Sequence, residues 1–196
     1  MKYFFLSIIV FMLQQPICYS QQRTKKNSEK SAVKAVAIKT LKWFFYIRNN
    51  PEKACKVDYL KGKEGDSTNP YRVDFKGVNG YFDYLKKTNL FSQKFCDDLL
   101  IYFKKCDSNF VAVKQYYSVP IGFEYNLITK DTDDMGVERN INKSLISSYK
   151  KIGNTVYLSL KFKNFYEYTF IITKYNGKWL IDNINGDFQP LVSTPV

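Results

Sequence analysis

The sequence predicts an α+β fold in which N-terminal helices pack on a curved antiparallel sheet. Apolar residues recur at helical spacing in the first half of the chain and alternate with polar residues in the second half. Helices precede strands without alternating strand and helix units, so the sheet is expected to be antiparallel. The pair Asn176-Gly177 lies between two alternating runs and favours the tight turn of a β-hairpin.

The first twenty residues predict an export signal. Lys2 supplies a positive end, residues 3–13 form an uncharged apolar run too short to span a bilayer, and Pro16 ends that run. We expect cleavage after Ser20, a location in the periplasm or cell envelope, and no transmembrane segment afterwards. The residues before Cys18 fit a lipid-attachment motif badly, so no lipid anchor is expected.

The rest of the chain predicts a single domain. Residues 21–30 are polar and rich in lysine, which is typical of a flexible lead-in. Residues 31–187 are expected to form one α+β domain, followed by a C-terminal tail at residues 188–196. With 196 residues, of which 45% are hydrophobic, the chain is long enough for one substantial core.

Three helical patterns come first in this domain. In residues 31–49, apolar side chains recur every three or four positions, and Pro51 stops the helix. Shorter apolar faces follow in residues 78–89 and 91–106, with Ser92 as the expected N-cap of the second. These helices are expected to cover the sheet.

The second half of the chain predicts strands. Alternation is strongest in residues 156–162, where apolar positions face one side and polar positions the other. A polar, acidic loop is expected at residues 129–142. The expected strands, in chain order, cover residues 111–125, with a break at residues 120–122, and residues 144–150, 156–162, 166–173 and 179–184.

The formal net charge of +12 suggests attraction to negative surfaces. The lysines, however, are spread along the chain and alternate with apolar residues, as on solvated faces of strands and helices. We therefore expect solubility and a general attraction to negative surfaces, and no nucleic-acid partner.

Three cysteines remain after the expected cleavage. Cys96 and Cys106 share one predicted helix, where ten residues separate them by roughly 15 Å, beyond the reach of a disulfide. A disulfide, if one forms, must therefore join Cys55 to Cys96 or to Cys106. Three free thiols are the alternative.

Several chemistries are excluded by composition. The chain has no histidine, which excludes Ser-His-Asp and Cys-His mechanisms. No glycine-rich phosphate loop is present, and the cysteines lack the spacing of a zinc site. Residues 131–136 resemble the start of a calcium loop, but Met135 and Asn142 occupy two ligand positions. We expect neither a metal site nor a cofactor.

The ending at residues 173–184, with Asn176-Gly177-Lys178-Trp179 between apolar runs, resembles the C-terminal hairpin of the nuclear-transport-factor-2-like superfamily. Residues 81–107 are similar to an exported bacterial branch of that superfamily labelled as lipoproteins. The resemblance implies a cone-shaped, cystatin-like α+β fold. It implies no single function, because the superfamily includes enzymes, ligand carriers and protein-binding modules. The absent lipid-attachment motif and the absent histidine are departures from the pattern.

The aromatic content, 16 Tyr, 16 Phe and 2 Trp, indicates binding. We expect a non-enzymatic exported module that binds a small apolar molecule or a protein partner, for instance as an envelope inhibitor or immunity-type protein. The residues expected to bind are Tyr157, Tyr166, Tyr168 and Asp182. The alternative is a small enzyme of isomerase type, with Asp182 as base and tyrosine hydroxyls as donors. A closed pocket holding Asp182 beside tyrosine hydroxyls would favour that alternative.

Overall fold

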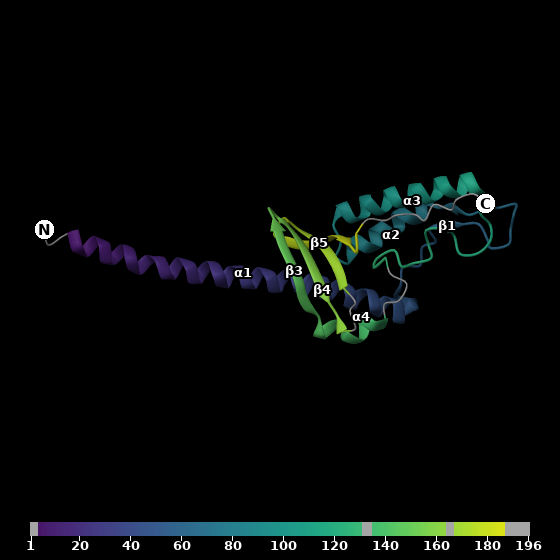
Figure 1. Cartoon of the computed structure of the whole chain (residues 1–196). Coiled ribbons are helices and arrows are strands. Elements are labelled where there is room, and N and C mark those ends of the chain that lie inside the picture. Colours follow the sequence, from purple (N-terminus) through teal and green to yellow (C-terminus); the bar gives the residue numbers. More distant parts are fainter. Residues whose placement is uncertain (1–3, 131–134, 164–166, 187–196) are drawn as a thin grey trace.

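The computed structural model describes residues 4–130, 135–163 and 167–186, and it has the predicted α+β architecture (Figure 1). The helices are α1 (Phe4–Asn49), α2 (Phe75–Lys87), α3 (Gln93–Val113) and α4 (Met135–Asn140), with short 3-10 helices η1 (Pro51–Lys53) and η2 (Ile141–Lys143). The main sheet contains β3 (Leu145–Ile152), β4 (Thr155–Lys161), β5 (Glu167–Tyr175) and β6 (Lys178–Ile184). The strands β1 (Leu60–Lys61) and β2 (Arg72–Val73) form a separate pair.

Helix α1 is much longer than the predicted helix at residues 31–49. It includes residues 21–30, which were expected to be a flexible lead-in. Neither glycine nor proline interrupts residues 17–49, and the Gln, Lys, Glu and Ala side chains there favour a helix. Figure 1 shows the N-terminal part of α1 projecting past the sheet. Glu29 pairs with Lys151 of β3, so the folded part begins before residue 31.

The face of α1 that packs in the core follows the predicted spacing of three and four residues. These side chains are buried in a stripe along the helix: Val33, Ala37, Thr40, Leu41, Phe44 and Phe45. Lys34 lies beside this stripe and donates to the backbone oxygen of Ser144 over 2.6 Å. Such a stripe is what an amphipathic helix needs to pack against a sheet.

The main sheet is an antiparallel meander in the order β3-β4-β5-β6. Three residue pairs cross β4 and β5 on the buried face: Val156 with Ile172, Leu158 with Phe170, and Leu160 with Tyr168. The turn between β5 and β6 has positive φ at both Asn176 (48°) and Gly177 (84°), which confirms the predicted hairpin.

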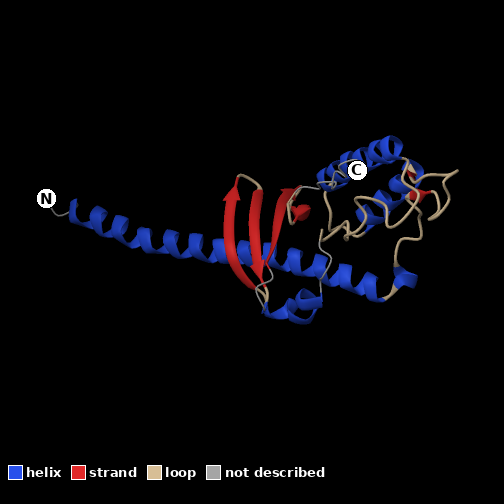
Figure 2. Cartoon of the chain, turned by 45° about the vertical axis from the view of Figure 1, so that its right-hand side comes forward, coloured by secondary structure: helices blue, strands red, loops and turns tan. Residues whose placement is uncertain are grey.

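The helices are not all cradled by the sheet. Figure 2 shows the strands bending as they cross α1, whereas α2 and α3 lie beyond the sheet in both views. The chain before α3 joins the β6 edge, where Ser92 N–H donates to Ile181 O over 3.0 Å and Ile181 N–H donates to Leu90 O over 2.8 Å. The outer strand β3 forms the other edge.

The strand predicted at residues 111–125 is wrong. Helix α3 continues to Val113, and residues 114–130 form a loop. The helix continues because Phe110 near its end is buried against Phe123 and Tyr71, with ring centroids 6.1 and 6.3 Å apart. The predicted cap at Ser92 is confirmed, since its hydroxyl accepts from Phe95 N–H. No helix among the described residues has an apolar stretch long enough to cross a bilayer.

Candidate functional site

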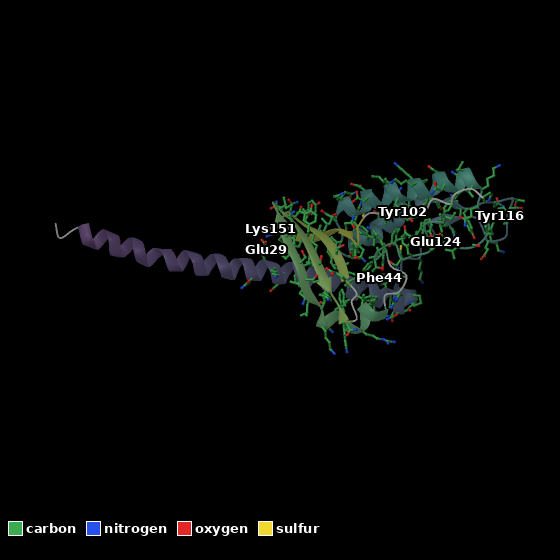
Figure 3. The ribbon with its side chains drawn as sticks, in the orientation of Figure 1. Glu29, Phe44, Tyr102, Tyr116, Glu124 and Lys151 are labelled. Carbon is green, nitrogen blue, oxygen red and sulfur yellow. The ribbon has the colours of Figure 1, made fainter. Side chains whose placement is uncertain are left out.

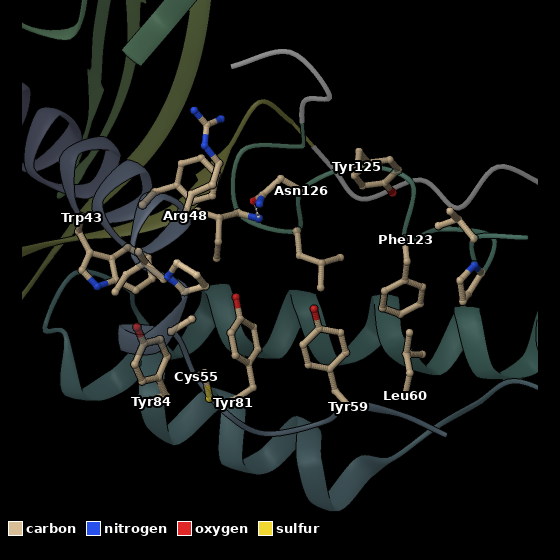
Figure 4. Close-up of a pocket in the computed structure, with 18 residues that line it drawn as sticks. Trp43, Arg48, Cys55, Tyr59, Leu60, Tyr81, Tyr84, Phe123, Tyr125 and Asn126 are labelled. Carbon is tan, nitrogen blue, oxygen red and sulfur yellow. Dashed lines mark hydrogen bonds between the residues drawn. The ribbon is translucent and has the colours of Figure 1, made fainter. Parts of the chain in front are cut away.

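A pocket of about 550 Å³ lies beside the C-terminal end of α1 (Figure 4). Its walls come from α1, from residues 51–60, from α2 and from the loop at residues 119–128. Small-molecule sites in proteins span roughly 300–1,000 Å³ and are lined mainly by apolar and aromatic side chains. The pocket fits both criteria, and it is the candidate functional site.

A continuous row of aromatic rings forms one wall of the pocket. Ring centroids are separated by 6.0 Å between Trp43 and Tyr84, 6.5 Å between Tyr84 and Tyr81, and 5.6 Å between Tyr81 and Tyr59. Phe123 stacks on Tyr59 at 6.0 Å and continues the row into the opposite loop. Aromatic rings at these distances attract one another, and these contacts hold the wall in place.

Helix α2 places two of these tyrosines. Tyr81 and Tyr84 are three residues apart, so they lie one turn from each other on the same side of the helix. The neighbouring stripe of Val78, Phe82 and Leu85 is buried in the core. Burial of that stripe fixes the rotation of α2 and turns the two tyrosines towards the pocket.

The third tyrosine is placed by close backbone packing. Residues 58–59 lie against α2 at Gly77, where an added Cβ would be only 1.8 Å from the carbonyl oxygen of Asp58. Asp74 N–H also donates to Tyr59 O over 3.0 Å. A glycine at position 77 is therefore required for Tyr59 to stand beside Tyr81.

The loop opposite this wall is held by helix α3. The buried hydroxyl of Tyr102 donates to the backbone oxygen of Gly122, and it lies 2.6 Å from the hydroxyl of Tyr125. Asn126 orders the next turn, because its side-chain oxygen accepts from Ile128 N–H over 2.8 Å. Both sides of the pocket are thus attached to the helical core.

The hydroxyl groups of the tyrosine wall face the interior of the pocket. Figure 4 shows Tyr59, Tyr81 and Tyr84 side by side, with their oxygens towards the side of Asn126 and Tyr125. Burial raises the pKa of Tyr59 and, more strongly, that of Tyr81, so both stay protonated. Neither hydroxyl has a hydrogen-bond partner among the residues that the structure describes. The hydroxyl of Tyr84 lies 3.5 Å from Lys53 O.

One cation lies at the pocket. The guanidinium of Arg48 stands over the Phe45 ring at 4.9 Å and pairs with Glu138 of α4 over 2.6 Å. Asn49 donates to the same carboxylate. Among the 18 lining residues drawn in Figure 4 there is neither Asp nor Glu. The described lining is therefore neutral to positive.

The structure describes three of the four residues predicted to bind. Tyr157 is 44% exposed on β4, whereas Tyr168 is 2% exposed and packs edge-on against Phe162 in the core. Tyr166 lies outside the described residues. Asp182 on β6 is 3% exposed. None of the three described residues lines the aromatic pocket.

Asp182 has other partners than those expected. Its carboxylate accepts from the Thr173 hydroxyl over 2.6 Å and from the Tyr175 hydroxyl over 3.1 Å. Burial and the nearby Asp182 charge raise the pKa of Tyr175. An Asp–Tyr pair is thus present, but it lies in the sheet and does not line the aromatic pocket.

The three cysteines are thiols in the structure. Cys55 lines the pocket and is half-buried, and Cys96 and Cys106 are buried on α3. No cluster of three or more metal-binding side chains occurs in the part of the chain that the structure describes. Residues 131–134 of the calcium-like loop fall outside that part.

Sequence reasoning missed this pocket because its lining comes from four separate segments. The signal that was present is the choice of Tyr over Phe at positions 59, 81 and 84, since a ring with a polar tip suits a surface that is neither core nor solvent. No family model matches the sequence, and neither a curated protein nor a solved structure matches it.

Proposed function

We propose that this chain is an exported, non-enzymatic binding module that holds a small, largely apolar molecule in the aromatic pocket. The observation that carries the proposal is the row Trp43, Tyr84, Tyr81 and Tyr59, which borders a space of about 550 Å³. Unlike the core, this space leaves tyrosine hydroxyls facing inward. Burial of apolar ligand surface against such rings would drive binding.

The export part of the proposal rests on the N-terminal pattern. Residues 4–20 belong to the part of α1 that projects away from the sheet in Figure 1, so their removal would leave the pocket intact. Cleavage after Ser20 is therefore compatible with the binding function, and a periplasmic or envelope location stays part of the proposal. The α+β architecture is consistent with membership of the nuclear-transport-factor-2-like superfamily, which stays part of the proposal.

A variant that fills the pocket tests the binding function. Ala54 lines the pocket, and Ala54→Phe would place a ring in the space. The matched control is Ala112→Phe, at an exposed position on α3. The probe 1-anilinonaphthalene-8-sulfonate, titrated by fluorescence into the full chain, is expected to bind the wild type and the control but not Ala54→Phe. Equal titrations of all three proteins, with equal thermal melting, would refute pocket binding.

A second candidate function, binding of a protein partner, is favoured by the turn at residues 116–119. Buried Gln115, 4% exposed, donates to the backbone oxygens of Tyr117 and Val119 and accepts from Ile121 N–H. The turn is therefore rigid, yet it leaves Tyr117 58% exposed and Val119 56% exposed. Figure 3 shows Tyr116 at the end of the molecule farthest from the N-terminus.

Rigid, exposed apolar side chains of this kind suit an inhibitor or immunity-type contact. Crosslinking from position 117 in the native envelope, with Tyr157 as the control position on the sheet, tests this candidate. We expect a protein that is crosslinked from position 117 and is not crosslinked from position 157. Recovery of the same proteins from both positions would rule the turn out as the contact site.

A further inference from the structure

We propose that the pocket selects an amphiphile whose apolar body ends in a carboxylate, with that carboxylate bound by Tyr59, Tyr81 and Asn126. This inference rests on the proposed binding function and names the ligand class of the same site. It follows from which polar groups of the lining already have partners and which do not.

The lining groups without a partner among the described residues can all donate a hydrogen bond. The hydroxyls of Tyr59 and Tyr81 face the space and have no partner among the described residues. The side-chain oxygen of Asn126 is occupied by Ile128 N–H and Thr129 N–H, at 2.8 and 3.3 Å, which leaves its amide nitrogen as a donor. Partly buried donors lose free energy unless they find an acceptor, so a ligand with acceptor oxygens gains from all three.

The charges around the pocket disfavour a cationic ligand. Arg48 is the charged residue in the described lining, and it pairs with Glu138 of α4, which does not line the pocket. A ligand ammonium would therefore meet aromatic faces and donors but no carboxylate in the lining. A carboxylate meets hydrogen-bond donors, and hydrogen bonds to ionised acceptors are the stronger kind.

The size of the space fits a single chain. A volume of about 550 Å³ equals that of roughly 18 liquid water molecules at about 30 Å³ each. Dodecanoate, with 14 heavy atoms by its formula, fits within that limit. The row from Trp43 to Tyr59 supplies an apolar wall along which such a chain can lie.

The test compares two single-chain probes with opposite head-group charge, dodecanoate and dodecylamine, each below its micelle concentration. Isothermal titration calorimetry of the full chain is expected to give at least about tenfold tighter binding of dodecanoate, because only the carboxylate can accept from the three donors. Equal binding of the two probes, or tighter binding of the amine, would overturn the proposed head group.

A double variant, Tyr59→Phe with Tyr81→Phe, locates the head group. It keeps both rings and removes only the hydroxyls, so it is expected to weaken dodecanoate by about 10- to 100-fold and to weaken dodecylamine less, because a hydrogen bond to the ionised carboxylate is the stronger kind. The control is Tyr116→Phe with Tyr117→Phe, outside the pocket. Unchanged dodecanoate binding in the pocket variant would overturn the assignment of these hydroxyls.

These experiments distinguish a wrong ligand class from a wrong binding function. If the head group is wrong, the two probes bind with equal affinity or the amine binds more tightly, and Ala54→Phe still abolishes binding of the anilinonaphthalene probe. If the function is wrong, Ala54→Phe changes neither dodecanoate, dodecylamine nor the anilinonaphthalene probe.

Discussion

The hydroxyl of Tyr102 on α3 lies 2.6 Å from the hydroxyl of Tyr125, which belongs to the loop opposite the tyrosine wall (Figure 3 labels Tyr102). Tyr102 also donates to the backbone oxygen of Gly122. Tyr102 is 1% exposed, so water has no access to this hydroxyl in the folded protein. The contact fixes one side of the pocket from the helical core.

Removal of this hydroxyl is expected to weaken the fold. Tyr102→Phe removes the hydrogen bond to the Gly122 carbonyl and the contact with the Tyr125 hydroxyl, which costs about 1–3 kcal/mol of the free energy of unfolding. Urea denaturation measures the loss, and Tyr157→Phe on the exposed face of β4 is the control. Combined with Tyr125→Phe, the loss is expected to be less than additive, because the two single variants remove the same contact. Full additivity would show that the two hydroxyls do not interact.

Gly122 is expected to tolerate no side chain. Its φ is +92°, and an added Cβ would lie 2.7 Å from the Tyr102 hydroxyl and 2.9 Å from the Cys106 sulfur. Gly177 is the matched control, since its φ is +84° and nothing lies within 4 Å of an added Cβ. Both variants to Ala have the backbone strain of about 1–2 kcal/mol. Gly122→Ala is expected to cost about 1–3 kcal/mol more by urea denaturation; equal losses would show that the loop can move away from α3.

The sequence predicted the sheet well because local patterns determine it. Alternation at residues 156–162 reflects one buried and one exposed face, and Asn176-Gly177 matches the dihedral angles of the hairpin. Apolar and polar residues also alternate in parts of residues 111–125. There, however, side chains such as Gln115 and Tyr102 form hydrogen bonds with the backbone, and no strand pairing is present in this described segment. The periodicity of apolar residues indicates which side chains are buried. It does not indicate which groups form hydrogen bonds with the backbone.

The candidate site was not predictable in the same way. The aromatic strands predict a binding site at Tyr157, Tyr166, Tyr168 and Asp182, whereas α1 packs on β6 with a stripe of buried side chains that includes Ala37 and Leu41. The pocket arises where α1 continues past the sheet to meet α2. Contacts between segments so far apart in the chain leave no periodic signal in the sequence.

The thiols are expected to differ in reactivity. Burial raises the pKa of Cys96 and of Cys106 to about 11, so only about 0.1% of each is thiolate at pH 8. Cys55 lines the pocket and is half-buried. Mass spectrometry after a short N-ethylmaleimide pulse at pH 8 is expected to find Cys55 modified first.

A pocket ligand is expected to protect Cys55. Saturation with dodecanoate should slow its modification, and the reaction of Cys96 and Cys106 should appear only in urea. Cys55→Ser is the control that identifies the fast site. Fast modification of Cys96 or Cys106 in the folded protein would contradict the burial of α3 described above.

The ion pair between Glu29 and Lys151 tests how far α1 packs along the sheet. Lys151 Nζ lies 2.7 Å from one carboxylate oxygen, and the Tyr149 hydroxyl donates to the other over 3.2 Å (Figure 3). The hydrogen bond from Lys151 lowers the pKa of Glu29 below its ordinary value. Because the folded-state pKa is the lower one, the pair adds stability above about pH 4, and this contribution is lost as the pH falls through the folded-state pKa.

Glu29→Gln should therefore lower the free energy of unfolding at pH 7, by less than about 1 kcal/mol because the pair is partly exposed. At pH 3 the difference from the wild type should shrink, because the contribution of the pair decreases as the pH falls below the ordinary pKa of a glutamate. Urea denaturation at both pH values measures this, with Glu64→Gln in an exposed loop as the control. The exchange Glu29→Lys with Lys151→Glu should restore most of the loss at pH 7. A difference that is the same at both pH values, with no recovery on exchange, would mean that residues 21–30 do not pack on β3, as expected of a flexible lead-in.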